Sequence, residues 1–87
     1  MTQASAEILA LKALAWLVNS DGARDRFLAE TGADALNLRE SAGEPEFLGA
    51  VMDFLMGDEA LAAGFCEDET LTPETLHRAR HALPGAA

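Results

Sequence analysis

Apolar residues recur along this chain at intervals of three and four positions, with short breaks between the runs. No stretch alternates apolar and polar residues as a half-buried strand does. The strongest run follows Glu44-Pro45, where proline suits the first position of a helix. Its apolar residues keep the spacing of an amphipathic helix: Phe47, Leu48, Val51, Met52, Phe54 and Leu55. The pattern therefore predicts an all-α protein.

Turn and capping residues divide the pattern into five to six short helices, which we expect to form one compact bundle over residues 1–87. Asp34 and Thr72 are residue types that accept a hydrogen bond from the first turn of a helix, and Gly32 suits a left-handed helix end. We expect the first helix from Ser5 to Asn19, the second from Asp21-Gly22 to Gly32, and the third from Asp34 to Gly43. The fourth should run from Glu44-Pro45 to Gly57-Asp58, a fifth should follow Asp58, and the sixth should run from Thr72-Pro73 to Pro84-Gly85.

The chain also resembles itself at an offset of 38 positions. This offset aligns apolar residues with apolar residues and caps with caps: Leu9 with Phe47, Trp16 with Phe54, Leu17 with Leu55, Phe27 with Phe65, Asp34 with Thr72, and Leu38 with Leu76. We therefore predict two pseudo-repeated three-helix units, residues 7–43 and 45–83, packed face to face. The first and fourth helices are the most apolar, so they should supply the central layer.

The charge and the cysteine content limit the partners and the cellular compartments that suit this protein. Fifteen acidic and six basic residues give a formal net charge of −9, which disfavours nucleic acid and anionic membranes as partners. The single cysteine, Cys66, excludes an intramolecular disulfide and favours a reducing compartment. The apolar run from Ile8 to Val18 is shorter than the roughly 20 residues of a membrane span and lacks the features of a signal peptide. We predict a cytoplasmic protein whose first helix is buried.

A nucleic-acid-binding function is the alternative from another class. Leu28, Gly32 and Leu38 keep a spacing typical of a helix-turn-helix, although any two packed helices need the same spacing. The sixth helix contains the only basic cluster of the chain: His77, Arg78, Arg80 and His81. Cations near a helix C-terminus also complement the helix dipole, so this cluster is typical of a solvated helix end as well.

Catalytic and metal-binding chemistry find little support. His77 and His81 are spaced to share a metal, with Glu74 one turn earlier, but Cys66 completes no known zinc-binding spacing. The acidic residues around Asp58 and Glu67 lack the loop pattern of a calcium site. Cys66 with either histidine is the only nucleophile and base pair worth naming. We expect no enzyme, no metal, no cofactor and no small-molecule substrate.

Several short motifs together resemble a family of small proteobacterial proteins known as domain of unknown function 3572. The motifs cover nearly the whole chain: Arg26-Phe27-Leu28, Thr31-Gly32, Leu38-Arg39, Phe47-Leu48, Val51-Met52-Asp53-Phe54-Leu55, Asp58-Glu59 and Phe65. They are mostly packing and capping residues. The resemblance implies a compact helical protein and assigns no activity, cofactor or catalytic residue.

The leading hypothesis is a non-enzymatic protein-interaction or regulatory domain whose partner is itself or another protein. A helix that is apolar on nearly all sides is stable only if other protein surface packs against nearly all of it. A chain this short has a small core, so there are two alternatives for the helix around Trp16. It is buried within the monomer, or its surplus apolar surface forms an interface bordered by acidic residues. The candidate surface residues are Trp16, Asp53, Asp58 and Glu59.

Overall fold

The computed structural model describes residues 1–85. Within these residues the chain forms six α-helices and one short 3-10 helix, joined by short turns. This confirms the all-α prediction. The elements are α1 (Gln3–Val18), α2 (Asp21–Thr31), η1 (Ala35–Asn37), α3 (Leu38–Ser41), α4 (Pro45–Met56), α5 (Glu59–Glu69) and α6 (Pro73–His81). None of these helices is both long enough and apolar enough to cross a lipid bilayer.

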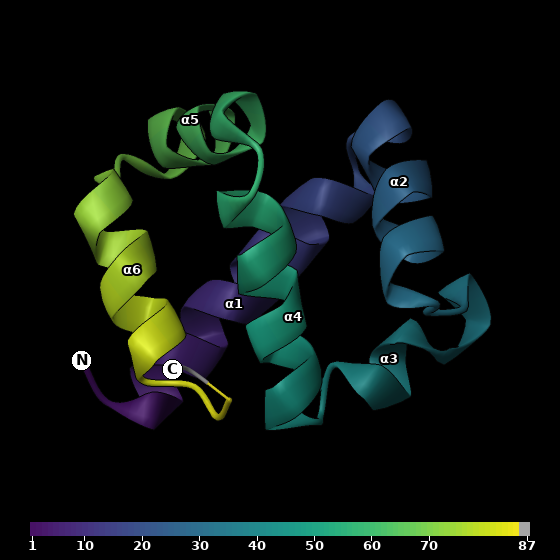
Figure 1. The fold of residues 1–87 in the computed structure, drawn as a ribbon, viewed down its shortest axis with the longest axis horizontal. Helices are drawn as coiled ribbons and strands as arrows, with labels where there is room; N and C mark the ends of the chain where they lie inside the picture. Colours follow the sequence, from purple (N-terminus) through teal and green to yellow (C-terminus); the bar gives the residue numbers. More distant parts are fainter. Residues whose placement is uncertain (86–87) are drawn as a thin grey trace.

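The two most apolar helices, α1 and α4, make the most extensive contact between any two elements. In Figure 1, α4 crosses in front of α1, with α5 and α6 on one side and α2 and α3 on the other. α2 packs on α1, α5 packs on α4, and α6 contacts both central helices. Every other long helix therefore rests on α1, on α4 or on both.

Aromatic rings fill the space beside this crossing. Phe27 of α2 is fully buried and makes edge contacts with two rings of α4, those of Phe47 at 5.9 Å and Phe54 at 5.3 Å between centroids. Phe65 of α5 is also fully buried and meets Trp16 of α1 at 5.8 Å. Such pairs add to the free energy gained by burying the rings. These contacts fix α2 against α4 and α5 against α1.

Capping residues set most of the helix ends at or near the predicted positions. The side chains of Asp34, Asp58 and Thr72 each accept a hydrogen bond from a backbone N–H of the first turn that follows. Thr2 does the same for α1, so this helix begins at Gln3, two residues before the expected start. These bonds satisfy backbone donors that a helix start otherwise leaves unpaired.

The offset of 38 also relates the helix ends. It aligns Asp21–Thr31 with Glu59–Glu69, and it aligns the left-handed Gly32, with φ of 70°, with Thr70, with φ of 56°. A threonine rarely adopts this conformation, and here the bond from the Leu71 N–H to the Cys66 carbonyl at 2.8 Å accompanies it. The division into two repeated units itself stays a prediction.

Two expectations need correction. The third helix is not continuous from Asp34 to Gly43, because its first turn is a 3-10 helix and only Leu38–Ser41 is α-helical. Leu36 is 90% exposed, whereas Leu38 and Ala42 are the residues of this segment that pack against the core. With only Leu38 and the small Ala42 packed against the core, the segment gains too little packing to extend a regular helix.

The expectation that the first helix is buried is wrong for its outward side. Ala6, Leu9, Ala10, Ala13, Leu14 and Leu17 point inward and are buried. On the opposite side, Ile8 is 58% exposed and Leu11 is 42% exposed. The reason is geometric, since α2, α4 and α6 cover only one side of α1.

Replacing Phe27 by alanine tests the aromatic core. Because the ring is fully buried and touches both Phe47 and Phe54, Phe27→Ala should lower the free energy of unfolding by about 3–5 kcal/mol. The control is Leu36→Ala, which removes a side chain that is 90% exposed and should change stability by less than about 0.5 kcal/mol. Urea unfolding followed by circular dichroism measures both. Equal effects would contradict this core.

Candidate functional site

Trp16, a predicted interaction residue, is half-buried and held by contacts within the chain. Its indole Nε1–H donates to Oδ2 of Asp68 at 2.7 Å, and its ring lies against Phe65 and the backbone of Gly64. A Cβ at Gly64 would come within 3.2 Å of the indole, so glycine allows this close approach. The indole therefore joins α1 to α5, and Trp16 lies between the two alternatives that the sequence left open, neither fully buried nor free of contacts.

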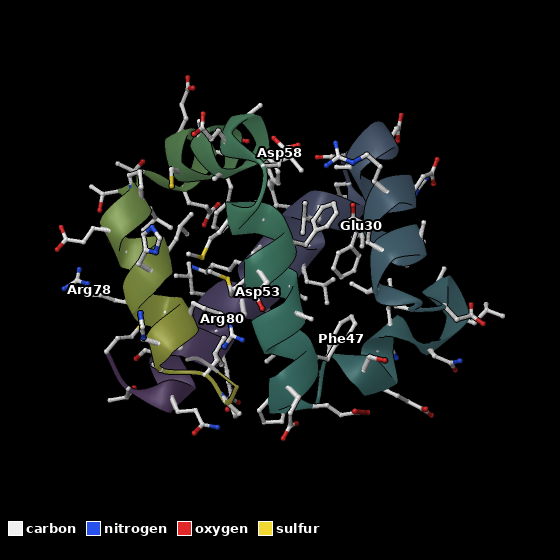
Figure 2. All side chains as sticks on the ribbon, viewed as in Figure 1. Glu30, Phe47, Asp53, Asp58, Arg78 and Arg80 are labelled. Carbon is white, nitrogen blue, oxygen red and sulfur yellow. The ribbon has the colours of Figure 1, made fainter. Side chains whose placement is uncertain are left out.

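Asp53 forms a two-point ion pair with Arg80 (Figure 2). Nε of Arg80 donates to Oδ1 of Asp53 at 2.7 Å, and Nη2 donates to Oδ2 at 3.2 Å. The guanidinium also donates to the Pro84 carbonyl at 3.1 Å and lies over Gly49, where a Cβ would sit only 3.2 Å from it. The Arg80 side chain is only 15% exposed. The pair therefore fastens α6 and the segment after it to α4.

Asp58 links three helices at the start of α5. Its Oδ1 accepts from the backbone N–H groups of Ala60 and Leu61, and its Oδ2 accepts from Nη2 of Arg26 at 3.0 Å. The Arg26 guanidinium also lies 5.5 Å from the centre of the Phe54 ring. The Leu61 backbone bond and the Arg26 guanidinium lower the pKa of the Asp58 carboxyl below its usual value. The contacts of Asp58 are those of a helix cap.

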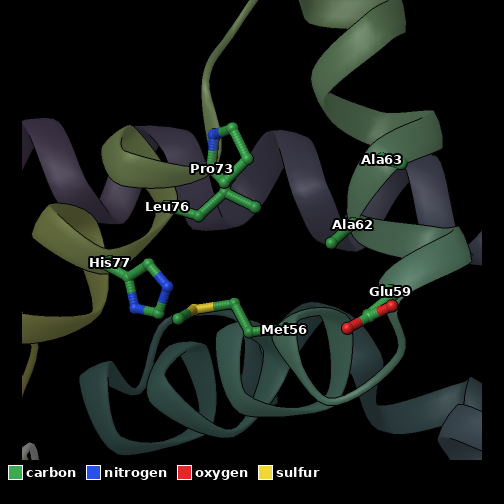
Figure 3. A pocket seen from close by; sticks show the side chains of 7 residues that line it. All are labelled: Met56, Glu59, Ala62, Ala63, Pro73, Leu76 and His77. Carbon is green, nitrogen blue, oxygen red and sulfur yellow. The ribbon is translucent and has the colours of Figure 1, made fainter.

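Glu59 and His77, from two different predicted sets, line one open pocket of about 400 Å³. The pocket lies between the end of α4, the start of α5 and the start of α6, and most of its wall is apolar. Figure 3 shows the imidazole and the carboxylate on opposite sides, with the Met56 side chain between them. The full lining is Met56, Glu59, Ala62, Ala63, Pro73, Leu76 and His77. No hydrogen bond or ion pair within residues 1–85 joins Glu59 to His77.

The predicted basic cluster of α6 is divided. His77, Arg78 and His81 are exposed, and Arg78 points outward in Figure 2, but Arg80 is turned toward Asp53. Among the residues described, no three histidine, cysteine or acidic side chains lie close enough together to hold a metal ion. Cys66 is buried, and its burial raises the pKa of the thiol. A raised pKa leaves less of the reactive thiolate.

The apolar surface that the site prediction did not name lies on α1. An open groove of about 470 Å³ runs between α1 and α3 with the residue that follows it, and we call it the α1–α3 groove. Its lining is Leu11, Leu14, Ala15, Val18, Leu38, Arg39 and Ala42. Ile8 lies one turn before Leu11 on the same outward side of α1. The sequence did carry a signal, because α1 is apolar on nearly all sides, but the predicted interaction residue on this helix was Trp16.

A family model described as "Protein of unknown function (DUF3572)" matches residues 3–86, nearly the whole chain. This match confirms the resemblance that the packing and capping motifs indicated. Among curated proteins and among solved structures, nothing matches the chain significantly.

The lowered pKa of the Asp58 carboxyl, due first to the Leu61 backbone bond and then to Arg26, predicts a specific dependence of stability on pH. Because its pKa is lowered in the folded state, the stabilisation is present above the unfolded pKa and is lost as pH falls through the folded pKa. Asp58→Asn keeps a capping oxygen but loses the charge that faces Arg26. The variant should therefore have a lower unfolding temperature than wild type near neutral pH, and the gap should shrink below about pH 4. Thermal unfolding at several pH values measures the gap, and a gap that persists at low pH would contradict this assignment.

Proposed function

The chain belongs to the DUF3572 family, and we propose that it is a non-enzymatic, cytoplasmic protein-interaction domain. The partner presents an amphipathic helix, which packs along the outward side of α1 and the adjoining α1–α3 groove. The observation that carries this proposal is the exposure of Ile8 and Leu11, at 58% and 42%, on a helix whose other side forms the core. An unpaired cysteine suits a reducing compartment such as the cytoplasm.

The exposed apolar residues are grouped and not scattered. Ile8, Leu11 and Ala15 follow one another at intervals of three and four along one side of α1, and all three are exposed. Leu11 and Ala15 also line the α1–α3 groove. A single exposed leucine is ordinary on a protein surface, whereas a contiguous apolar patch beside a groove is typical of a binding surface.

The second half of the chain supports the same interpretation. The offset of 38 sets Ala15 on Asp53, Ala42 on Arg80 and Leu11 on Gly49. In the second half, the Asp53–Arg80 ion pair over Gly49 closes the space between α4 and α6. In the first half, the matching residues carry no charge, and the matching space is the open groove. Because the corresponding space in the second half is closed within the chain, the open apolar groove of the first half is suited to binding a partner.

The shape and charge of this surface favour a helix with few charges. α1 has 16 residues and is therefore about 24 Å long, enough for roughly four turns of a second helix. Glu7 and Lys12 are the only charged residues of α1, and Arg39 lies in the groove. In helix packing, the side-chain ridges of one helix fit into the grooves of the other, so an amphipathic helix buries Ile8 and Leu11 efficiently.

The observations favour a protein partner over nucleic acid. Of the four basic residues that the sequence places in the last helix, Arg80 is 15% exposed and is neutralised by Asp53. The would-be recognition helix of the first half, α3, has only four residues. The other basic residues lie on a chain with a formal net charge of −9, which weakens attraction to phosphates.

Site-specific photo-crosslinking in the cell from which the gene derives tests this function. A benzophenone side chain placed at Ala15 should form an adduct with a protein, and mass spectrometry should map the attachment to one side of a helix. The control carries the same probe at Glu67, an exposed residue of α5. We expect the adduct from position 15 and not from position 67. The absence of any adduct at position 15, or equal adducts at both positions, would overturn the proposed function.

A further inference from the structure

We infer that the helix that packs on α1 is α1 of a second copy of this chain, so that two copies pair through their first helices. This inference rests on the proposed function, because it names the partner of the same surface. It comes from the order of apolar and charged residues along the outward side of α1.

The outward side of α1 carries a heptad pattern. Its residues are separated by four and three positions in strict alternation, and we call them the α1 seam: Ala4, Ile8, Leu11, Ala15 and Val18. The first four are exposed, and Val18 is half-buried. This alternation keeps apolar residues facing a partner helix that winds around the first. An outward side that served only as solvated surface has no need of it.

The two large residues of the α1 seam indicate the kind of pair. If Leu11 occupies the d position of the heptad, then Ile8 occupies the a position. A β-branched residue at a and leucine at d favour two parallel helices over three or four. The pattern therefore points to a parallel dimer, in which Ile8 meets Ile8 and Leu11 meets Leu11 of the second copy.

The flanking charges fit the same arrangement. Glu7 precedes Ile8 at a g position, and Lys12 follows Leu11 at an e position, on the opposite flank of the seam. In a parallel pair, a g residue faces the e residue five positions later in the other helix, so Glu7 faces Lys12 of the second copy. Symmetry repeats this ion pair. An antiparallel pair would not join these two residues.

Both side chains are available for this pairing. In the single chain, Nζ of Lys12 approaches Oε1 of Glu69 only to 4.0 Å, and the two side chains are 60% and 36% exposed. Glu7 accepts one bond from the amide of Gln3, at 2.9 Å on the surface. Such exposed contacts contribute little to stability, so exchanging them for contacts across the dimer has a small cost.

The charge of the whole chain favours contact at this helix. α1 contains one acidic and one basic residue, so it is neutral, while the chain carries a formal net charge of −9. Two copies that meet through α1 bring neutral surfaces together and leave the other carboxylates outside the contact. The seam is short, so we expect a weak dimer with a dissociation constant on the order of 10–100 μM.

Sedimentation equilibrium of the purified full chain tests the pairing. The wild type should pass from monomer to dimer over the micromolar range, and Leu11→Glu should remain monomeric with unchanged helical circular dichroism. Glu69→Gln is the matched control, because it removes the contact of Lys12 within the chain without touching the α1 seam. This control should dimerise like the wild type. A wild type that stays monomeric at about 1 mM would overturn the inference.

A charge exchange tests the register and the direction. Glu7→Lys places two lysines beside the seam, and Lys12→Glu places two glutamates there, so each variant alone should dimerise at least threefold more weakly than the wild type. Mixed in equal amounts, the two variants should restore association as a heterodimer, because each lysine then faces a glutamate. Variants that dimerise like the wild type, or a mixture that is no stronger than either variant, would overturn the parallel pair.

The crosslinking experiment separates this inference from the function on which it rests. An adduct from position 15 to a second copy of the chain supports both. An adduct only to another protein leaves the proposed function intact and overturns the second copy as its partner. The absence of any adduct overturns both.

Discussion

The contact between α1 and α4 is the constraint on which the rest of this structure depends. Leu17 of α1 and Leu55 of α4 are both fully buried, and α2, α5 and α6 pack against one or both of these helices. A chain of 87 residues buries a limited share of its surface, so the core has little depth beyond this crossing. The caps and ion pairs at the edges, such as Asp58 with Arg26 and Asp53 with Arg80, then hold the outer helices in place.

The same constraint explains why apolar surface remains on the outside. Three helices approach α1 from one side, and the short α3 covers little of the other. In the second half of the chain, α6 is nine residues long and reaches both central helices. The exposed side of α1 is therefore a direct consequence of the unequal lengths of α3 and α6. We relate this difference in helix length to function. In the second half an ion pair closes the space beside α4, whereas in the first half the space beside α1 stays open and is lined mostly by apolar residues.

Much of the fold could be predicted from the sequence, because local signals determine it. The spacing from Phe47 to Leu55 and the caps at Gly32 and Thr72-Pro73 act within a few residues of where they stand. The interactions that the sequence could not indicate join distant residues, such as Trp16 with Asp68 and Asp53 with Arg80. Together with the pair of Asp58 and Arg26, these contacts give three of the candidate surface residues a structural role. The exposure of Ile8 likewise depends on which helices come to lie beside α1, and periodicity alone cannot decide this.

The central claim is that the two sides of α1 have separate roles, one in the fold and one in binding. The most direct test is the free energy of unfolding of Leu17→Ser and Ile8→Ser, measured by urea in dilute solution where the chain is monomeric. Leu17 is fully buried, so its replacement should lower stability by about 3–5 kcal/mol. Ile8 is 58% exposed, so its replacement should change stability by less than about 1 kcal/mol. Equal losses from the two substitutions would contradict the account.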